Sequence, residues 1–287
     1  MRSCSIILSA IVCCVALVAG ESADERDLLY GIADGQELRL NVYRPGATGV
    51  RPGLVLIHGG AWSAGDRSEW QQIAPMLTAQ GYVLFAIGYR LVTDTGNRWP
   101  AQLQDAARAM RWVRAHAARF AVDPQRIGAI GGSAGGHIVA CLGIGPEPRE
   151  EDPALAGVSS RPTCIVNMCG PSDLSESYVG QVVQGEWTDQ QIARLLGGPP
   201  AHRPDLARSA SPLLQVAAGA PPVLLIQGRN DELVPWRQAE AYATALRKVG
   251  AEAELLLHDG GHDMGDTVTT LRCMIALNGF LRRHLHP

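Results

Sequence analysis

The sequence predicts an α/β fold with an eight-stranded, mostly parallel β-sheet that carries helices on both faces. Short apolar runs flanked by Gly and Pro alternate with longer stretches in which apolar residues recur every three to four positions, which is the pattern of strands alternating with helices. The chain has 287 residues, of which 46% are hydrophobic and 18% charged, so it can bury a substantial core. We expect one domain over residues 21–287.

Eight segments have the composition of strands. The first two flank the turn sequence at residues 33–35, which predicts an antiparallel hairpin at the sheet edge. The eight predicted strands are Asp27–Gly31, Glu37–Tyr43, Leu54–His58, Val83–Tyr89, Arg126–Gly131, Thr163–Met168, Val223–Gln227 and Ala253–His258.

Three stretches between and after these strands have helical periodicity. Over residues 103–120 the apolar residues fall on one helical face, and Arg108, Arg111 and Arg119 lie off it, which predicts a sheet-covering helix with solvated arginines. A second helix over residues 239–249 should end at Gly250, and a third covers residues 271–281. These helices supply the layers that the sheet requires.

Two segments interrupt the alternation, residues 145–162 and residues 170–210. In the second, Thr188 followed three residues later by Gln191 predicts a capping box that opens a short helix, which Gly197 should end. Excursions of this length over the carboxyl ends of strands commonly form lids or pocket walls. We expect residues 170–210 to form such a wall.

Residues 1–20 have the pattern of a secretory signal peptide. Arg2 precedes an apolar run at residues 6–19, which is shorter than the ~20 residues that span a bilayer. The small residues at 18–20, at the end of this run, fit a signal-peptidase cleavage site. The sequence therefore predicts a secreted or periplasmic protein with no stable membrane insertion after signal cleavage. The alternative is a membrane tether that remains uncleaved.

Charge and cysteine content exclude several classes of function. The 25 Lys and Arg nearly balance the 28 Asp and Glu, so the chain has no basic excess for nucleic acid. Outside the predicted signal peptide only four cysteines remain, and none has the spacing of a zinc site. We predict no nucleic-acid partner, no metal and no cofactor, and oligomeric state cannot be inferred.

A candidate nucleophile lies in the sequence Gly131-Gly132-Ser133-Ala134-Gly135, which fits G-x-S-x-G. The motif directly follows a predicted strand and precedes a helical stretch, which is the context it requires. The alternative is a glycine-rich turn at a helix start. We favour Ser133 as a nucleophile whose hydroxyl is exposed on a tight strand-to-helix turn.

The sequence His58-Gly59-Gly60-Ala61-Trp62 follows another predicted strand and is similar to the oxyanion loop of esterases. Backbone N–H groups can point at a substrate oxygen only where side chains leave room for it. We therefore predict Gly60, Ala61 and Ala134 as oxyanion-hole donors. His58 precedes the nucleophile in the chain, so we expect it to brace this loop rather than act as a base.

An acid and a base should follow Ser133 in that order. Asp231 lies in the loop after the seventh predicted strand and His262 in the loop after the eighth, so both reach the sheet edge of Ser133. In this prediction His262 takes the serine proton and Asp231 orients its ring. Asp173 is a competing acid, and so are three neighbours in the chain, Glu232, Asp259 and Asp263.

Taken together, these motifs resemble the α/β-hydrolase carboxylesterases of the hormone-sensitive-lipase-like group, and most closely the bacterial branch with bifunctional feruloyl and acetyl-xylan esterases. The resemblance covers nearly all of residues 21–287. It rests on ordered matches: LVLIHGGAW (54–62), IGYRL (87–91), WPAQLQDAARAMRWVRAHAARFAVDPQRIG (99–128), GGSAGGH (131–137), NMCGPSDL (167–174), LLGGPP (195–200), ASPL (210–213), LLIQGRNDELVP (224–235) and DGGHDM (259–264).

The resemblance implies the α/β-hydrolase fold and carries the family's serine, acid and histidine onto Ser133, Asp231 and His262. Two departures occur: Gly132 replaces a larger or acidic residue, and Ala61 replaces a third glycine. The implied function is a serine carboxylesterase that hydrolyses short-chain acyl esters, including acetyl or feruloyl esters of plant polysaccharide, with a small-molecule or oligosaccharide ester as substrate.

Two alternatives remain open, an arylformamidase-like amide hydrolase and a non-catalytic binding protein with a hydrolase fold. Four tryptophans are candidates for an aromatic wall around the substrate, or are packing residues. These four are Trp62, Trp99, Trp187 and Trp236.

Overall fold

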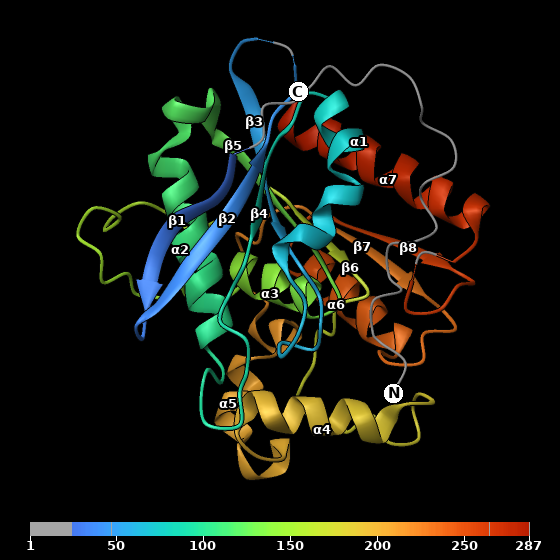
Figure 1. Ribbon diagram of the computed structural model, residues 1–287. Helices are drawn as coiled ribbons and strands as arrows, with labels where there is room; N and C mark the ends of the chain where they lie inside the picture. Colours follow the sequence, from blue (N-terminus) through green and yellow to red (C-terminus); the bar gives the residue numbers. More distant parts are fainter. Residues whose placement is uncertain (1–24, 47, 264, 287) are drawn as a thin grey trace.

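The computed structural model describes residues 25–46, 48–263 and 265–286, so the predicted signal peptide lies outside the described residues. One eight-stranded sheet runs through the molecule in the order β1-β2-β4-β3-β5-β6-β7-β8 (Figure 1). The strands are β1 (Glu25–Ala33), β2 (Gln36–Tyr43), β3 (Arg51–Ile57), β4 (Val83–Ile87), β5 (Val122–Gly132), β6 (Ile165–Met168), β7 (Val223–Gly228) and β8 (Ala253–His258).

The strand pairing confirms the prediction of a mostly parallel sheet. Neighbouring strands from β4 through β3 to β8 are parallel, whereas β1 pairs with β2, and β2 with β4, in antiparallel fashion. The β1–β2 hairpin turns at Asp34 and Gly35, both of which have positive φ, and β1 is an edge of the sheet. Because parallel strands share a direction, the loops after β3, β5, β7 and β8 emerge at one end of the sheet.

Helices cover both faces of the sheet (Figure 1). They are α1 (Ala74–Ala79), α2 (Ala101–Ala115), α3 (Ala134–Gly143), α4 (Gly185–Leu196), α5 (Pro204–Ser209), α6 (Trp236–Lys248) and α7 (Thr267–Leu285). Alternating residues of β3 enter opposite cores: Val55 and Ile57 pack in the cluster with α2, α3 and α6, and Leu54 and Leu56 pack in the cluster with α1 and α7. A strand that is buried on both faces reads as the continuous apolar run seen in the sequence.

Two helix predictions were wrong in detail. The helix expected over residues 103–120 ends at Ala115 and continues as a 3-10 turn at Ala117–Phe120. The helix expected to open at Thr188 begins at Gly185, and the Thr188 hydroxyl donates to the Gln184 carbonyl oxygen from inside the helix at 3.1 Å. Its end is as predicted, because Gly197 has φ of 74° and caps α4.

The expectation that the helix arginines are solvated is wrong for Arg111, which is buried. Its guanidinium donates to the Val158 and Pro148 carbonyl oxygens at 3.0 and 2.7 Å and lies 3.5 Å from the Glu147 carboxylate. Arg119, in contrast, is exposed. The acidic segment at residues 145–162 therefore folds back onto α2, which the helical pattern of α2 could not reveal.

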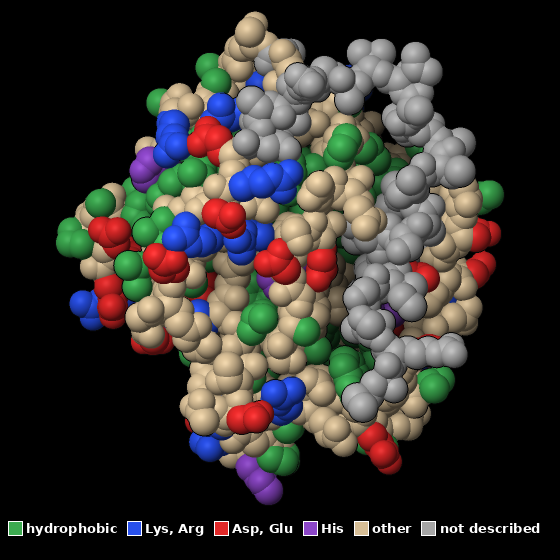
Figure 2. Space-filling view, in the orientation of Figure 1, with side chains coloured by type: hydrophobic (Ala, Val, Ile, Leu, Met, Phe, Trp, Pro, Cys, Tyr) green, Lys and Arg blue, Asp and Glu red, His purple; other side chains and the backbone are tan. Residues whose placement is uncertain are grey.

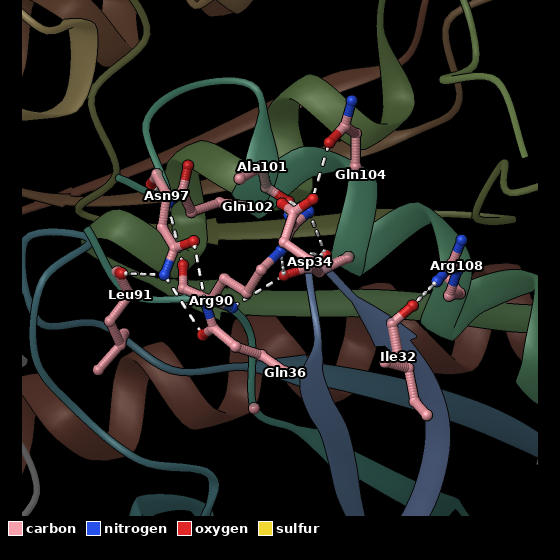
Figure 3. A network of polar contacts seen from close by, with 12 residues as sticks. Ile32, Asp34, Gln36, Arg90, Leu91, Asn97, Ala101, Gln102, Gln104 and Arg108 are labelled. Atoms are coloured by element: carbon pink, nitrogen blue, oxygen red, sulfur yellow. Dashed lines mark hydrogen bonds and ion pairs between the residues drawn. The ribbon is translucent and has the colours of Figure 1, made fainter. Parts of the chain in front are cut away.

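A second buried arginine joins the hairpin to α2 (Figure 3). The Arg90 guanidinium donates to the Asp105 carboxylate on α2 at 2.8 Å, and Arg90 also pairs with Asp34 in the turn between β1 and β2. Nearby, Arg108 donates to the Ile32 carbonyl oxygen at 2.6 Å. These contacts fix the edge hairpin against the helical layer.

On the face shown in Figure 2, acidic and basic side chains lie next to one another, and neither sign of charge dominates. Within the described ranges no helix combines the length and apolarity that a membrane crossing requires.

Candidate active site

The turn that carries Ser133 is a tight connection from β5 to α3. Ser133 has φ of 54° and ψ of −120°, a conformation that costs energy for a residue with a side chain. The turn requires glycine on both sides: a Cβ on Gly131 would lie 2.2 Å from the Gly135 carbonyl oxygen, and one on Gly135 would lie 2.0 Å from the Ile57 carbonyl oxygen. This packing places the Ser133 hydroxyl at the end of the sheet.

Three side chains from three loops form a hydrogen-bonded row at this end. The His262 Nε2 lies 2.8 Å from the Ser133 Oγ, and the His262 Nδ1 lies 2.8 Å from Asp231 Oδ2. Because an ionised carboxylate only accepts hydrogen bonds, Nδ1 carries the ring proton and Nε2 is free to accept from the serine hydroxyl. These are the three residues that the sequence singled out.

The Asp231 carboxylate is held on every side. Its Oδ1 accepts from the N–H groups of Leu233 and Val234, both at 2.8 Å, and its Oδ2 accepts from Gln227 Nε2 at 2.7 Å as well as from His262. A ligand atom of Cys169 also lies within 4.8 Å of those of Asp231 and His262. Since both carboxylate oxygens already accept two hydrogen bonds, this arrangement favours orientation of the imidazole over coordination of a metal ion.

The segment at residues 58–65, here called the oxyanion loop, lies beside Ser133. Gly60, Ala61 and Trp62 have φ of 105°, 49° and 59°, and a Cβ on Gly60 would lie 2.2 Å from the Ala64 carbonyl oxygen. Gly60, Ala61 and Ala134 all line the same pocket as Ser133, and their N–H groups have no acceptor among the described residues. Unpaired donors at this place can bind an anionic oxygen.

The competing candidates His58 and Asp173 are held in other contacts. His58 is buried and stacks on Tyr89 at 4.3 Å, its Nδ1 contacts the Gly59 carbonyl oxygen at 2.8 Å, and burial lowers its pKa to about 4. Asp173 accepts from the Ser175 and Ser211 hydroxyls at 2.6 and 3.2 Å rather than from His262. His58 therefore braces the oxyanion loop, and Asp173 holds the start of the 170–210 excursion.

The pocket above Ser133 has a volume of about 540 Å³. Trp62, Trp70 and Trp187 line it, together with polar side chains that include Glu69 and Gln191. Trp187 and Gln191 come from α4, and α4 and α5 lie beyond one end of the sheet in Figure 1. The expected wall at residues 170–210 thus contributes directly to the pocket.

The suggested aromatic wall is only partly right. Trp99 and Trp236 are not among the residues that line this pocket. Trp99 is buried and donates to the Ser209 hydroxyl at 3.2 Å, and the guanidinium groups of Arg229 and Arg237 each lie 5.0 Å from the Trp236 ring centroid. Both are packing residues.

The sequence analysis missed the pocket wall formed by residues 66–72. Asp66 caps this 3-10 helix by accepting from the Ser68 N–H at 2.8 Å, and Glu69 accepts in return from the Asp66 N–H at 3.1 Å. The spacing of Asp66 and Glu69 is that of a capping box, so a signal for this element was present. Burial raises the pKa of Glu69, which lines the pocket.

Comparison with known proteins decides the family. The BD-FAE family model matches residues 40–246. The chain belongs to the BD-FAE family. An ethyl acetate hydrolase from Pseudomonas putida is 30% identical over 258 residues, which cover 85% of this chain and 77% of that protein. The probable carboxylic ester hydrolase LipM from Mycobacterium tuberculosis is 30% identical over 90% of this chain and 61% of LipM, so the chain spans about six tenths of that relative.

Solved structures give the same fold. An esterase from Thermogutta terrifontis with propionate bound has 27% sequence identity and a TM-score of 0.77, covering 91% of this BD-FAE chain and 95% of that chain. A carbohydrate esterase from gut microbiota has 24% identity and a TM-score of 0.79 over 93% of this chain and 97% of that one, which supports the fold alone. The α/β-hydrolase fold expected from the sequence is therefore confirmed.

Proposed function

We propose that this BD-FAE protein is a serine carboxylesterase that hydrolyses short-chain acyl esters with Ser133, His262 and Asp231 as its catalytic residues. The observation that carries the proposal is the unbroken hydrogen-bonded row from Ser133 Oγ through the His262 ring to Asp231 Oδ2, with both links at 2.8 Å. Relatives named as esterases and ester hydrolases support it.

In the acylation step the Ser133 oxygen attacks the ester carbonyl carbon while its proton passes to His262 Nε2. The carbonyl oxygen becomes an oxyanion, which the N–H groups of Gly60, Ala61 and Ala134 stabilise. When the intermediate collapses, the ester C–O bond breaks, and the leaving alcohol takes the proton from His262.

Deacylation repeats the sequence with water as the nucleophile. His262 Nε2 accepts a proton from water, the hydroxide attacks the acyl carbon, and Ser133 leaves with that proton. Asp231 keeps the Nδ1 proton in place throughout, because its four hydrogen bonds fix the carboxylate toward the ring. The products are a carboxylic acid and an alcohol.

The primary test is Ser133→Ala with p-nitrophenyl acetate as substrate. We expect turnover to fall to background while the melting temperature stays close to that of the wild type, and a fluorophosphonate probe should label the wild type alone. Ser159→Ala is the matched control, because Ser159 is exposed on the 145–162 segment and should change neither result. Retained activity or labelling in Ser133→Ala would contradict the proposal.

Substrate choice separates the remaining alternatives. An arylformamidase-like enzyme would prefer a formyl amide to an ester of the same aromatic group, and a non-catalytic binding protein would fail to react with the fluorophosphonate. A panel of acetyl, butyryl, longer acyl and feruloyl esters then defines the acyl group. The pocket of about 540 Å³ has room for a feruloyl group as well as for shorter acyl groups.

Trp187 offers a test of the feruloyl part of this proposal. Its side chain lines the pocket and is 38% exposed, so an aromatic acyl group can stack on it. We expect Trp187→Ala to raise KM for a feruloyl ester by about five-fold and to leave KM for the acetyl ester nearly unchanged. Trp236→Ala, outside the pocket, is the control; an equal change for both esters would contradict stacking.

We also propose that residues 1–20 direct export and are then removed. The apolar run at residues 6–19 and the four remaining cysteines, none of which requires a disulfide, are compatible with a secreted or periplasmic enzyme. Mass spectrometry of exported protein should find a mature chain that begins near residue 21. Exported material that begins at Met1 would contradict cleavage.

A further inference from the structure

His137 is buried behind the site, where its ring contacts Trp62, the Ala210 carbonyl oxygen and, at 3.5 Å from Nε2, the Cys141 Sγ. Trp62 Nε1 donates to its Nδ1 at 3.1 Å, and its Nε2 lies 2.6 Å from the Ala210 carbonyl oxygen. The side chain is 0% exposed, and its ring lies edge-on to Trp62, with the centroids 5.3 Å apart. The proposed mechanism does not use this residue.

The contacts with Trp62 and Ala210 require one tautomer of the neutral ring. The indole N–H of Trp62 can only donate, so Nδ1 must accept, and the Ala210 carbonyl can only accept, so Nε2 must carry the proton. Burial lowers the pKa of His137 to about 4, so the ring is neutral at neutral pH. The His137 side chain is therefore a fixed bridge with one donor and one acceptor.

The bridge joins the two halves of the oxyanion hole. Trp62 directly follows Gly60 and Ala61, which provide donors on one side. His137 lies one helical turn after Ser133 on α3, and its N–H donates to the Ser133 carbonyl oxygen at 3.0 Å. The third donor, Ala134, begins the same helix. The contact between Trp62 and His137 thus links the two sets of donors through side chains.

The oxyanion loop needs such an external constraint. Ala61 and Trp62 both have left-handed φ, which costs about 1–2 kcal/mol for each residue that is not glycine. Two backbone hydrogen bonds within the loop end on the Gly60 carbonyl oxygen, and the Val92 N–H donates to the Trp62 carbonyl oxygen at 2.9 Å. These bonds hold the main chain, and the indole–imidazole bond ties that main chain to α3.

We propose that His137 is a positioning residue, which acts through Trp62 to hold the oxyanion loop at the correct distance from the helix that carries Ser133. The inference rests on the proposed esterase function. It predicts that the loss of one hydrogen bond, which does not involve the reacting serine hydroxyl, lowers the rate of the chemical step more than it weakens substrate binding.

The first experiment compares two identical substitutions. Trp62→Phe keeps an aromatic ring but removes the donor to His137. Trp99→Phe is the control, because it removes the donor to Ser209 and leaves the bond between Trp62 and His137 in place. The Trp99 ring also packs beside His137, with the two ring centroids 5.1 Å apart. With p-nitrophenyl acetate we expect Trp62→Phe to lower kcat about ten-fold and to change KM by less than about two-fold. Trp99→Phe should keep wild-type kinetics.

The second experiment removes the acceptor. His137→Leu has no polar atom that could accept from the Trp62 indole N–H, so it should lower kcat at least as much as Trp62→Phe. If both act through the same bond, the double variant should be no slower than the slower single variant. Multiplied effects in the double variant would overturn the proposal.

A third measurement uses the unaltered protein, so the proposal stays testable even if the variants do not fold. Nitrogen-15 NMR should find His137 as the Nε2–H tautomer and the Trp62 indole proton protected from exchange; the Nδ1–H tautomer would overturn the proposal. A wild type without activity on any ester would contradict the proposed function instead. An active wild type whose Trp62→Phe variant has the same kcat would contradict only the positioning role.

Discussion

Two buried aspartates of this protein, Asp231 at the candidate site and Asp105 on α2, have similar exposure but different kinds of partner. Asp231 is 7% exposed and faces the imidazole ring of His262, and Asp105 is 1% exposed and faces the permanent charge of Arg90. Both carboxylates are fully hydrogen-bonded: Asp231 accepts from four groups, and Asp105 accepts from the Arg90 guanidinium and backbone N–H.

The difference between the partners separates reactivity from stability. A guanidinium stays protonated at any ordinary pH; burial would lower the pKa of Arg90, but the Asp105 and Asp34 carboxylates raise it above its usual value. An imidazole can exchange its proton within a catalytic cycle. Substitutions at Asp105 should therefore affect the free energy of unfolding, and substitutions at Asp231 should affect kcat.

The largest effect expected from this comparison is the loss of activity in Asp231→Asn. The asparagine oxygen can still accept from the Leu233 and Val234 N–H groups, but its NH2 then faces His262 Nδ1 and forces the proton to Nε2. The imidazole can no longer accept from Ser133, so kcat for p-nitrophenyl acetate should fall about 10⁴-fold. The variant should retain its fold by circular dichroism. A loss below ten-fold would show that another group orients His262.

The matching change on the other side is Asp105→Asn. It leaves the Arg90 guanidinium, 5% exposed, without its buried anion. Removal of one partner from a buried pair costs about 3–5 kcal/mol, so we expect that loss in the free energy of unfolding by urea denaturation. The folded fraction should keep wild-type kcat, because neither residue lines the pocket. A fall in kcat without loss of stability would contradict the division between the two regions.

A fall in pH should lower the free energy of unfolding through buried histidines near the site and not through the Arg90 guanidinium. Burial lowers the pKa of both His58 and His137 to about 4, whereas an unfolded histidine titrates near ~6.5. Between these values the unfolded chain binds more protons than the folded one, so stability falls as the pH drops from ~6.5 to 4. The loss is roughly 3 kcal/mol for each histidine.

Urea unfolding at several pH values in that window measures the slope. Burial also lowers the pKa of His258, so His58→Asn removes one of three such groups and should flatten the dependence by no more than about half, whatever its effect on stability at neutral pH. The Arg90 pair contributes no such slope through its guanidinium, which stays charged. An unchanged slope in His58→Asn would show that His58 is protonated in the folded protein.

The elements around the site could be predicted because their signals are local. The G-x-S-x-G turn needs its glycines within a few residues of Ser133, and the order of acid and base follows from the strand order. The sequence therefore predicted that Asp231 and His262 lie in loops that meet beside Ser133. Their roles in catalysis stay predictions until the variants are measured.

The features that could not be predicted depend on contacts between distant segments. Arg111 and Arg119 both lie off the apolar face of the predicted helix, but Arg111 contacts the folded-back residues 145–162 and is buried, whereas Arg119 is exposed. Asp105 likewise reads as a polar helix residue until Arg90 is brought beside it. Whether Trp99 or Trp187 lines the pocket depends on the path of residues 170–210, which no periodicity determines.

The smallest expected effect tests whether burial, rather than charge, gives the Arg90 pair its stability. Asp34 pairs with the same guanidinium as Asp105, but its side chain is 77% exposed. Water solvates the Asp34 carboxylate well, and Asp105 stays paired with Arg90, so Asp34→Asn should cost less than about 1 kcal/mol. Asparagine also tolerates the left-handed φ of 49° at this turn, so the backbone adds no penalty. Urea denaturation of both variants in parallel makes the comparison direct. Equal losses in the free energy of unfolding would mean that the stabilisation depends on the number of carboxylates that pair with Arg90 and not on how deeply each carboxylate is buried.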